Sequence, residues 1–194
     1  MSIHGALRFV VLLGSLRRGS FNAAVARALP ALAPPETTII PLGSIGDFPI
    51  YNGDVEARGM PAAVVAMGEA IGKADGVIVV TPEYNYSIPG GLKNAIDWLS
   101  RLKPNPFLDK PVALASASLG ALGGARAQYH LRQTFVVLEA RVFNKPEVFV
   151  GKASQKIDAT TGELTDQPTR EIVAKQLAGF AAFTRAHQRG AAVT

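Results

Sequence analysis

The sequence predicts a doubly wound α/β fold, in which about five parallel strands lie in the order 2-1-3-4-5 and helices cover both faces of the sheet. The first observation is three short apolar runs, at residues 8–13, 77–81 and 112–115. Runs that are apolar throughout are typical of parallel strands covered on both sides. The second observation is that each run precedes a loop containing glycine or proline and then a longer helical pattern. This strict alternation favours a parallel sheet.

The other elements follow the same rhythm. Further strands fit residues 37–42 and 141–143, and the last resumes at residues 147–150 after Pro146. Pro61 and Pro168 suit the first turn of a helix, where a missing N–H is not needed. The expected helices span residues 22–32, 61–74, 91–101, 124–138 and 168–187. The last of them carries one apolar face, made by Val173, Leu177, Phe180 and Thr184.

Composition indicates the class of protein. The chain has 194 residues, of which 48% are hydrophobic and 18% charged, so we expect one globular domain over residues 1–194. It lacks a run approaching the ~20 apolar residues of a membrane span, and its start lacks the pattern of a signal peptide. We therefore expect a cytoplasmic protein without a membrane partner. The net charge of +5 comes from scattered basic residues, with only Arg17 and Arg18 adjacent, so no nucleic-acid partner is expected.

The chain contains no cysteine, which excludes disulfides, cysteine-ligated metal and a thiol nucleophile. Any redox chemistry must therefore come from a bound organic cofactor. The histidines, His4, His130 and His187, are far apart and lack the spacing of metal ligands. We interpret them as surface or packing residues and expect no metal site.

The loop at residues 14–22 has the composition of a phosphate-binding loop. Glycines let successive N–H groups point inward, and the following helix adds partial positive charge. Ser15, Ser20 and Asn22 can donate to phosphate oxygens, and Arg17 can add a charge-assisted bond. The spacing fits neither a P-loop nor a dinucleotide fingerprint, and no acid ends the strand at residues 37–42. The alternative interpretation is a polar loop with Ser20 as the helix cap.

Two further loops follow the strands at residues 77–81 and 112–115. In the first, prolines and glycines stiffen and bend a backbone suited to a flat ring read by main-chain groups, although Tyr84 and Tyr86 are equally compatible with simple packing. Changing Gly90 or Gly91 to Val is accordingly expected to reduce turnover more than Asn85→Ala does. The other loop is small, and Ser118 is its expected hydroxyl contact.

The three loops together resemble the NAD(P)H-dependent FMN reductase family, in its chromate and quinone reductase branch. The motifs are GSLRRGSFN at residues 14–22, TPEYNYSIPGGLKNAIDW at 81–98 and SLGALGGARAQYHLRQ at 118–133. The resemblance implies a flavodoxin-like fold, with one FMN held by its phosphate in the first loop and by its ring in the others. The implied phosphate contacts are Ser15, Leu16, Arg17, Arg18, Gly19, Ser20, Phe21 and Asn22. The implied ring contacts are Pro82, Glu83, Tyr84, Asn85, Tyr86 and Ser118.

The resemblance also implies the activity. NADH or NADPH gives a hydride to the N5 of FMN, and a quinone or chromate then takes the electrons, without a catalytic side chain. We interpret Glu83 and Asp97 as solvated or capping residues, and Arg101 either as a guide for anions or as a cation at a helix C-terminus. The alternatives are a flavodoxin-type electron carrier without its own substrate, against which the basic pI weighs, and a flavin-free regulatory domain.

A homo-oligomer, either dimer or tetramer, is expected. The helix at residues 92–102 is predicted to leave apolar surface that needs cover, at Ile96, Trp98 and Leu99. The resemblance implies that the chain pairs through this region. The resemblance implies a polar network between dimers, formed by Arg126, Tyr129 and Glu147. The alternative is that these three residues are simply solvated.

Overall fold

The structure, a computed structural model, describes residues 5–191. Its strands form one parallel sheet in the order β2-β1-β3-β4-β5, and β6 pairs with β4 beyond β5. This confirms the predicted topology, including the last strand, which is interrupted around Pro146. The strands are β1 (Leu7–Leu13), β2 (Thr37–Pro41), β3 (Gly76–Thr81), β4 (Pro111–Ala117), β5 (Arg141–Val142) and β6 (Val148–Val150).

Five long helices cover the sheet, as the sequence predicts. They are α1 (Phe21–Leu32), α3 (Ala62–Gly72), α4 (Gly90–Leu99), α5 (Ala125–Val137) and α6 (Gln167–Ala191). Pro168 lies in the first turn of α6, whereas Pro61 is the residue just before α3. Three short elements have too few residues to show a hydrophobic period and were not predicted: α2 (Gly53–Glu56) and the 3₁₀ turns η1 (Ile45–Asp47) and η2 (Ala153–Gln155).

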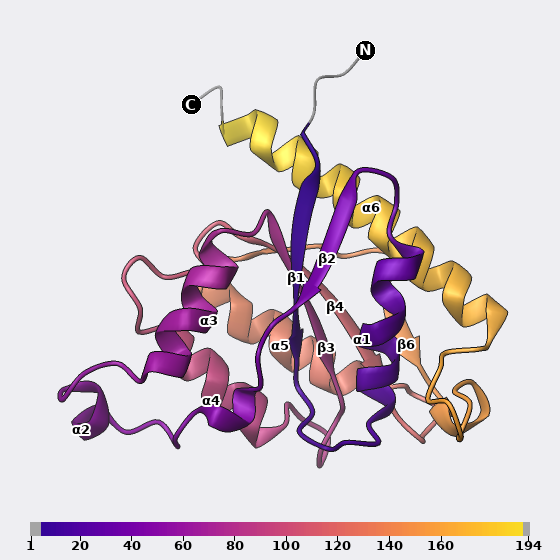
Figure 1. Ribbon diagram of the computed structural model, residues 1–194, viewed down its shortest axis with the longest axis horizontal. Coiled ribbons are helices and arrows are strands. Elements are labelled where there is room, and N and C mark those ends of the chain that lie inside the picture. Colours follow the sequence, from indigo (N-terminus) through magenta and orange to yellow (C-terminus); the bar gives the residue numbers. More distant parts are fainter. Residues whose placement is uncertain (1–4, 192–194) are drawn as a thin grey trace.

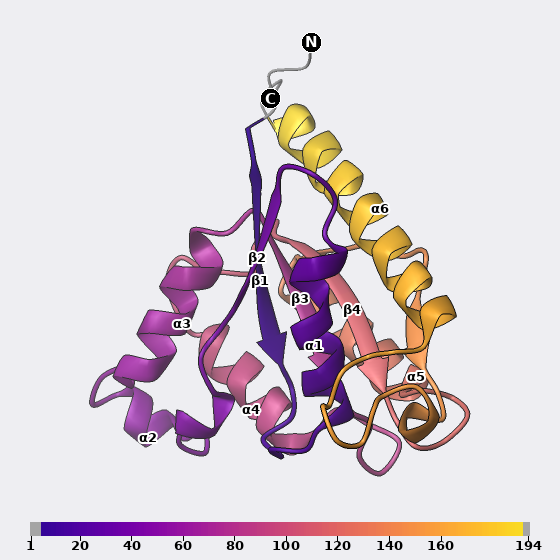
Figure 2. The same ribbon diagram turned by 45° about the vertical axis from the view of Figure 1, so that its right-hand side comes forward.

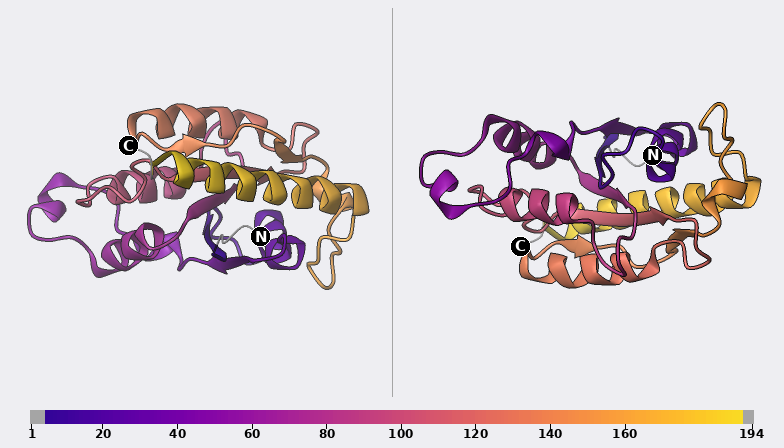
Figure 3. Two further views of the ribbon diagram at one scale, coloured as in Figure 1. Left: turned by 90° about the horizontal axis from the view of Figure 1, so that it is seen from above. Right: turned by 90° about the horizontal axis from the view of Figure 1, so that it is seen from below.

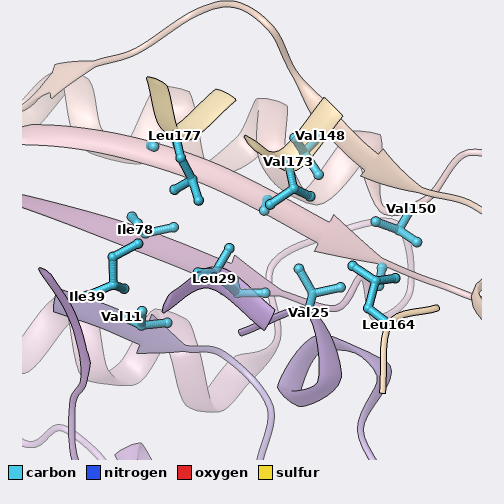
Figure 4. Packing of buried hydrophobic residues seen from close by; sticks show 14 of the residues in the cluster. Val11, Val25, Leu29, Ile39, Ile78, Val148, Val150, Leu164, Val173 and Leu177 are labelled. Atoms are coloured by element: carbon cyan, nitrogen blue, oxygen red, sulfur yellow. The ribbon is translucent and has the colours of Figure 1, made fainter. Parts of the chain in front are cut away.

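Figure 2 shows α1 and α6 on one side of the strands and α3 and α4 on the other. Side chains on the α1 and α6 side form one buried cluster, part of which is drawn in Figure 4, with Val173 and Leu177 packed over the strands. The predicted face of α6 is confirmed, because Val173, Leu177, Phe180 and Thr184 are all buried. A second cluster joins α3, α4 and α5 to the opposite face.

The apolar face of α4 is covered within the chain. Ile96, Trp98 and Leu99 are at most 1% exposed, so the expectation that they need cover from a partner is wrong. The segment after β2 folds back over this helix instead, and Trp98 Nε1 donates a hydrogen bond of 2.8 Å to Pro49 O. Beyond this contact, α2 lies at one extremity of the molecule (Figures 1 and 3). Sequence periodicity identified the buried face but not the chain segment that buries it.

Since the strands are parallel, the carboxyl ends of β1, β3 and β4 lie at one edge of the sheet. The loops that follow these strands meet there, at the bottom of Figure 1 and away from the described ends of the chain. Ligands of doubly wound sheets bind outside this edge, near the point where the strand order reverses. Within residues 5–191, no helix is both long and apolar enough to span a membrane.

Candidate functional site

A cleft of about 280 Å³ opens where the three loops meet. Its walls come from the loop between β1 and α1, the loop between β3 and α4, and the end of β4, so segments distant in sequence form one site. The lining residues are Ser15, Arg17, Ser20, Phe21, Asn22, Pro82, Glu83, Tyr84, Ala117, Ser118 and Leu119. Leu16, Arg18, Gly19, Asn85 and Tyr86 belong to the same loops but do not line this cleft. Ala117 and Leu119 line it although their apolar side chains gave no signal in the sequence.

The first loop presents a row of main-chain donors. Among the described residues, none of the N–H groups from Ser15 to Phe21 donates a hydrogen bond to a protein acceptor. Unpaired N–H groups at the start of a helix form a site for an anion, and the helix dipole adds to the attraction. The loop therefore has the donors that a phosphate monoester needs.

Gly14 sets the path of this loop. Its N–H donates to Val80 O at 2.8 Å, which ties the end of β1 to β3. A Cβ on Gly14 would lie 2.7 Å from Thr81 Oγ1 and 2.8 Å from Leu92 Cδ2, so only glycine fits here without displacing neighbours. The strand ends consequently lie in contact, and the loop turns toward the cleft directly after them.

The side chains of the first loop have two kinds of role. Ser20 is the N-cap of α1 and accepts from the N–H groups of Asn22 and Ala23, as the alternative interpretation proposed, while its own hydroxyl hydrogen remains available to a ligand. The Asn22 amide exchanges two hydrogen bonds with the main chain of Ala117, at 2.8 and 2.9 Å, and so fixes α1 to the end of β4. Arg17 is exposed at the cleft, with its guanidinium 5.8 Å from the Phe21 ring.

The second loop contains a tight turn. Tyr84 and Ser87 exchange two main-chain hydrogen bonds, and the central residues Asn85 and Tyr86 have φ values of 48° and 67°. This pattern matches a type I′ turn, which favours Asn and Gly. No acceptor in the described chain pairs with the N–H groups of Glu83, Asn85 or Tyr86, so the turn offers main-chain donors at the cleft edge.

The structure contradicts the backbone reason for the expected ranking of substitutions in this loop, whereas the ranking of turnover itself stays a prediction. A Cβ on Gly90 would meet nothing within 4 Å, and one on Gly91 would make only ordinary contacts at 3.8 Å. Neither glycine has the positive φ that disfavours a side chain. Asn85 does have it, so Asn85→Ala strains the backbone more than Val at either glycine.

The carboxylates near the cleft have partners within the chain, and Glu83 has the capping role that was one of the two expected. Glu83 caps α5 by accepting from the N–H groups of Arg126 and Ala127 at 3.0 and 3.2 Å, and Asp97 forms an ion pair with Lys93 at 2.7 Å. Arg101 lies over the Tyr51 ring at 5.2 Å, and the pKa of Tyr51 is raised, chiefly because its hydroxyl donates to Glu56. Since Glu83 and Asp97 are both engaged in these contacts, neither is placed as a general acid.

The third loop is shaped by close packing. A Cβ on Gly124, which has a φ of 88°, would lie 2.8 Å from the Ser116 Cβ, and the Ser116 hydroxyl donates to Gly123 O. Ser118 lies at the cleft, where its hydroxyl donates to Gly120 O at 3.3 Å and its N–H donates to Val150 O. The Gly123-Gly124 pair was the only sequence signal for this tight approach.

The remaining candidates make contacts within the chain. His130 Nδ1 lies 2.8 Å from the Ser87 hydroxyl and His187 Nε2 lies 3.0 Å from Asp109, while His4 lies outside the described residues. Among residues 5–191, no three His, Asp or Glu side chains gather where they could hold a metal ion. Arg126, Tyr129 and Glu147 contact Glu83, Phe149 and Arg132 respectively. The network between dimers stays a prediction.

The donor set of the cleft fits FMN. Free N–H groups, the buried Ser15 and the exposed Arg17 suit a doubly charged phosphate, and the turn at the cleft edge suits a flat ring with acceptor atoms. The two regions adjoin the same cleft, so one ligand can reach both.

Comparisons with known proteins agree with this geometry. A quinone reductase of Escherichia coli K12 is 54% identical over 178 residues, which cover 91% of this chain and 95% of the relative. An NAD(P)H-dependent FMN reductase of Pseudomonas aeruginosa is 48% identical over 172 residues, 89% of this chain and 92% of the relative. Among solved structures, the flavoenzyme NAD(P)H:(acceptor) oxidoreductase FerB of Paracoccus denitrificans matches with a TM-score of 0.83 and 32% identity, over 93% of this chain and 98% of that one. Residues 7–155, which include all three loops, match the family of NADPH-dependent FMN reductases, and this chain belongs to that family.

Proposed function

We propose that the chain binds FMN in this cleft and reduces quinones with electrons from NADH or NADPH. The observation that carries the proposal is the row of free N–H groups from Ser15 to Phe21, in a loop that shares its cleft with the turn after β3, where the N–H groups of Asn85 and Tyr86 are also free. A 2-hydroxy-1,4-benzoquinone reductase of Burkholderia, 39% identical over 181 residues, supports a quinone as the acceptor.

The residues have separate tasks. Ser15, Arg17 and Ser20, with the main chain of Leu16, Arg18, Gly19 and Phe21, would hold the phosphate, and Asn22 would keep this loop fixed to β4. Pro82 to Tyr86 and Ser118 would enclose the ring. The chemistry that FMN supplies when bound is hydride transfer at N5, and the protein contributes orientation and electrostatics. No described side chain is required as a nucleophile.

The direct test is to purify the protein with FMN and to measure NADH and NADPH oxidation with benzoquinone, with chromate and with no acceptor. We expect steady turnover with benzoquinone and almost none without an acceptor. A flavin that is reduced very slowly by either nucleotide, but exchanges electrons with a protein partner, would instead favour the electron carrier. Colourless protein that takes up no FMN would contradict the proposal.

The double variant Arg17→Ala/Ser20→Ala is expected to weaken FMN binding by at least about 100-fold, because hydrogen bonds to charged groups contribute ~1.5–3 kcal/mol each. Fluorescence titration of the FMN-free protein measures this. Arg58→Ala, which removes an exposed arginine outside the cleft, is the control for net charge. The melting temperature is recorded alongside, because Ser20 also caps α1. Unchanged FMN affinity in the double variant would contradict the assignment of this loop as the binding site for the FMN phosphate.

We also propose that the chain works as a homo-oligomer, a dimer or a tetramer. Val136 and Val137, at the end of α5, are 75% and 79% exposed, and apolar side chains exposed side by side mark association surfaces. Light scattering coupled to size exclusion is expected to give at least twice the mass of one chain. A monomer with full activity would contradict this.

Further proposals concern the domain organisation, the partners and the location of the protein. The two buried clusters flank one sheet, which supports a single domain over residues 1–194. Because the basic residues are scattered along the sequence and only Arg17 and Arg18 are adjacent, we propose no nucleic-acid partner, and we likewise propose no membrane partner. We propose the cytoplasm as its location, where NADH and NADPH are supplied.

A further inference from the structure

Glu83 has more contacts than a loop residue needs. Its Oε2 accepts from the N–H groups of Arg126 and Ala127, and its Oε1 accepts from the Arg126 guanidinium at 3.2 Å. The side chain is only 12% exposed, so this charge is largely withdrawn from water. A carboxylate with three donors at a helix N-terminus is held strongly, because charge-assisted bonds and the helix dipole act together.

Arg126 passes this restraint to the turn. Its guanidinium carbon lies 3.8 Å from the centre of the Tyr86 ring, close enough for a cation–π contact. Glu83 and Tyr86 are in the same loop, so the loop contacts Arg126 at two points, the carboxylate and the ring. The turn therefore cannot shift without breaking either the carboxylate contacts or the stacking.

The turn needs such a restraint. Tyr86 has a φ of 67°, and a side chain other than Gly or Asn in the left-handed region costs about 1–2 kcal/mol. Neither proline nor glycine lies within residues 84–87 to fix this shape. The hydrogen bond between Ser87 and His130 attaches the far end of the turn to α5, so both ends of the turn are fixed to one helix.

We propose that Glu83 is a positioning residue. By capping α5 and orienting Arg126, it holds the turn at Tyr84–Ser87 in the shape that presents the free N–H groups of Asn85 and Tyr86 to the ring of the bound flavin. The role toward the flavin rests on the proposed function, whereas the restraint on the turn does not. Glu83 takes no proton and touches no reacting atom in this role.

The first experiment uses FMN-free protein and measures amide hydrogen exchange in residues 84–87, where the N–H groups of Tyr84 and Ser87, which are hydrogen-bonded to each other's carbonyls, are the protected reporters. We expect exchange at least about tenfold faster in Glu83→Ala, with Glu83→Gln between it and the wild type, because an amide oxygen still accepts from the N–H groups but does not attract Arg126. Arg126→Met, which keeps the helix cap but removes the stacking and the ion pair, is expected to lie near Glu83→Gln.

Asp166 offers a matched control. It caps α6 by accepting from the N–H and hydroxyl of Thr169, and these contacts lower its pKa, but it does not line the cleft. Asp166→Ala removes the same kind of helix cap, and Asp166→Asn removes the charge but keeps an oxygen that accepts from the Thr169 N–H, which parallels Glu83→Gln. We expect these variants to lower the melting temperature without changing exchange in residues 84–87.

The second experiment uses FMN-loaded protein and stopped-flow reduction by NADH or NADPH. We expect the limiting rate of flavin reduction to fall about tenfold or more in Glu83→Ala, since small misplacements of reacting groups cost up to ~100-fold. The nucleotide concentration at half-maximal rate should change less than about threefold, because Glu83 does not contact the nucleotide.

The outcomes separate the two proposals. One outcome overturns the inference: the Glu83 variants, like the Asp166 variants, change only the melting temperature, while amide exchange in the turn and the rate of flavin reduction stay as in the wild type. Glu83 is then only a helix cap. A wild type that binds no FMN overturns the proposed function, while exchange in the FMN-free protein still decides whether Glu83 restrains the turn.

Discussion

Gly14→Val is expected to abolish FMN binding at micromolar concentrations and to destabilise the fold. The new Cβ would lie 2.7 Å from Thr81 Oγ1 and 2.8 Å from Leu92 Cδ2, where no atom fits. Thr81 is itself in β3, so we expect the end of β1 to move away from β3, which would break the hydrogen bond from Gly14 to Val80 and displace the donors that follow it. Overpacking of this kind costs about 1–3 kcal/mol, and the two γ-methyl groups of the β-branched valine add to it.

Gly19→Val is the matched control, since it makes the same change in the same loop. The nearest atom to a Cβ there is the Arg17 guanidinium nitrogen at 3.9 Å, and Gly19 has no positive φ. We expect this variant to keep its melting temperature and most of its FMN affinity. Flavin content after purification and fluorescence titration provide the measurement. Equal losses in both variants would mean that loop flexibility, rather than the contact at Gly14, governs binding.

The fold could be predicted because its signals are local. Continuous apolar strands at residues 77–81 and 112–115, followed by glycine- and proline-bearing loops, specify parallel strands and hence the edge at which a ligand binds. The short α2 and the cover over α4 could not be predicted. They depend on where the segment after β2 lies, which no hydrophobic period encodes.

The site was predictable in outline but not in its bonding. Composition identified the loop at residues 14–22, yet only the structure shows that its N–H groups lack partners while the Asn22 amide is engaged by Ala117. Similarly, the prolines and glycines of the second loop, Gly90 and Gly91 among them, indicated where its backbone bends. The residues with positive φ are Asn85 and Tyr86, because the turn forms there. Residue type indicates which conformations are possible, whereas the neighbours decide which one occurs.

Trp98 shows the same dependence on neighbours, and its removal should have the largest effect on stability. The side chain is fully buried, the Tyr51 ring packs edge-on at 5.0 Å, and the indole N–H donates to Pro49 O. Trp98→Ala is expected to lower the free energy of unfolding by about 3–5 kcal/mol, through lost burial and the cavity that remains. Urea unfolding followed by circular dichroism measures this, because Trp98 is the only tryptophan and fluorescence would be lost with it.

Two further variants divide the effect into its parts. Trp98→Phe keeps an aromatic ring but not the N–H, and Asn94→Ala removes the hydrogen bonds of Asn94 to Pro49 and Tyr51 while keeping the indole. Each is expected to cost about 1–3 kcal/mol, less than Trp98→Ala. Trp98 is buried by residues of the same chain. Trp98→Phe should therefore also leave the mass of the assembly unchanged. If Trp98→Phe lowers the mass of the assembly and changes the free energy of unfolding little, Trp98 lies at an interface between chains.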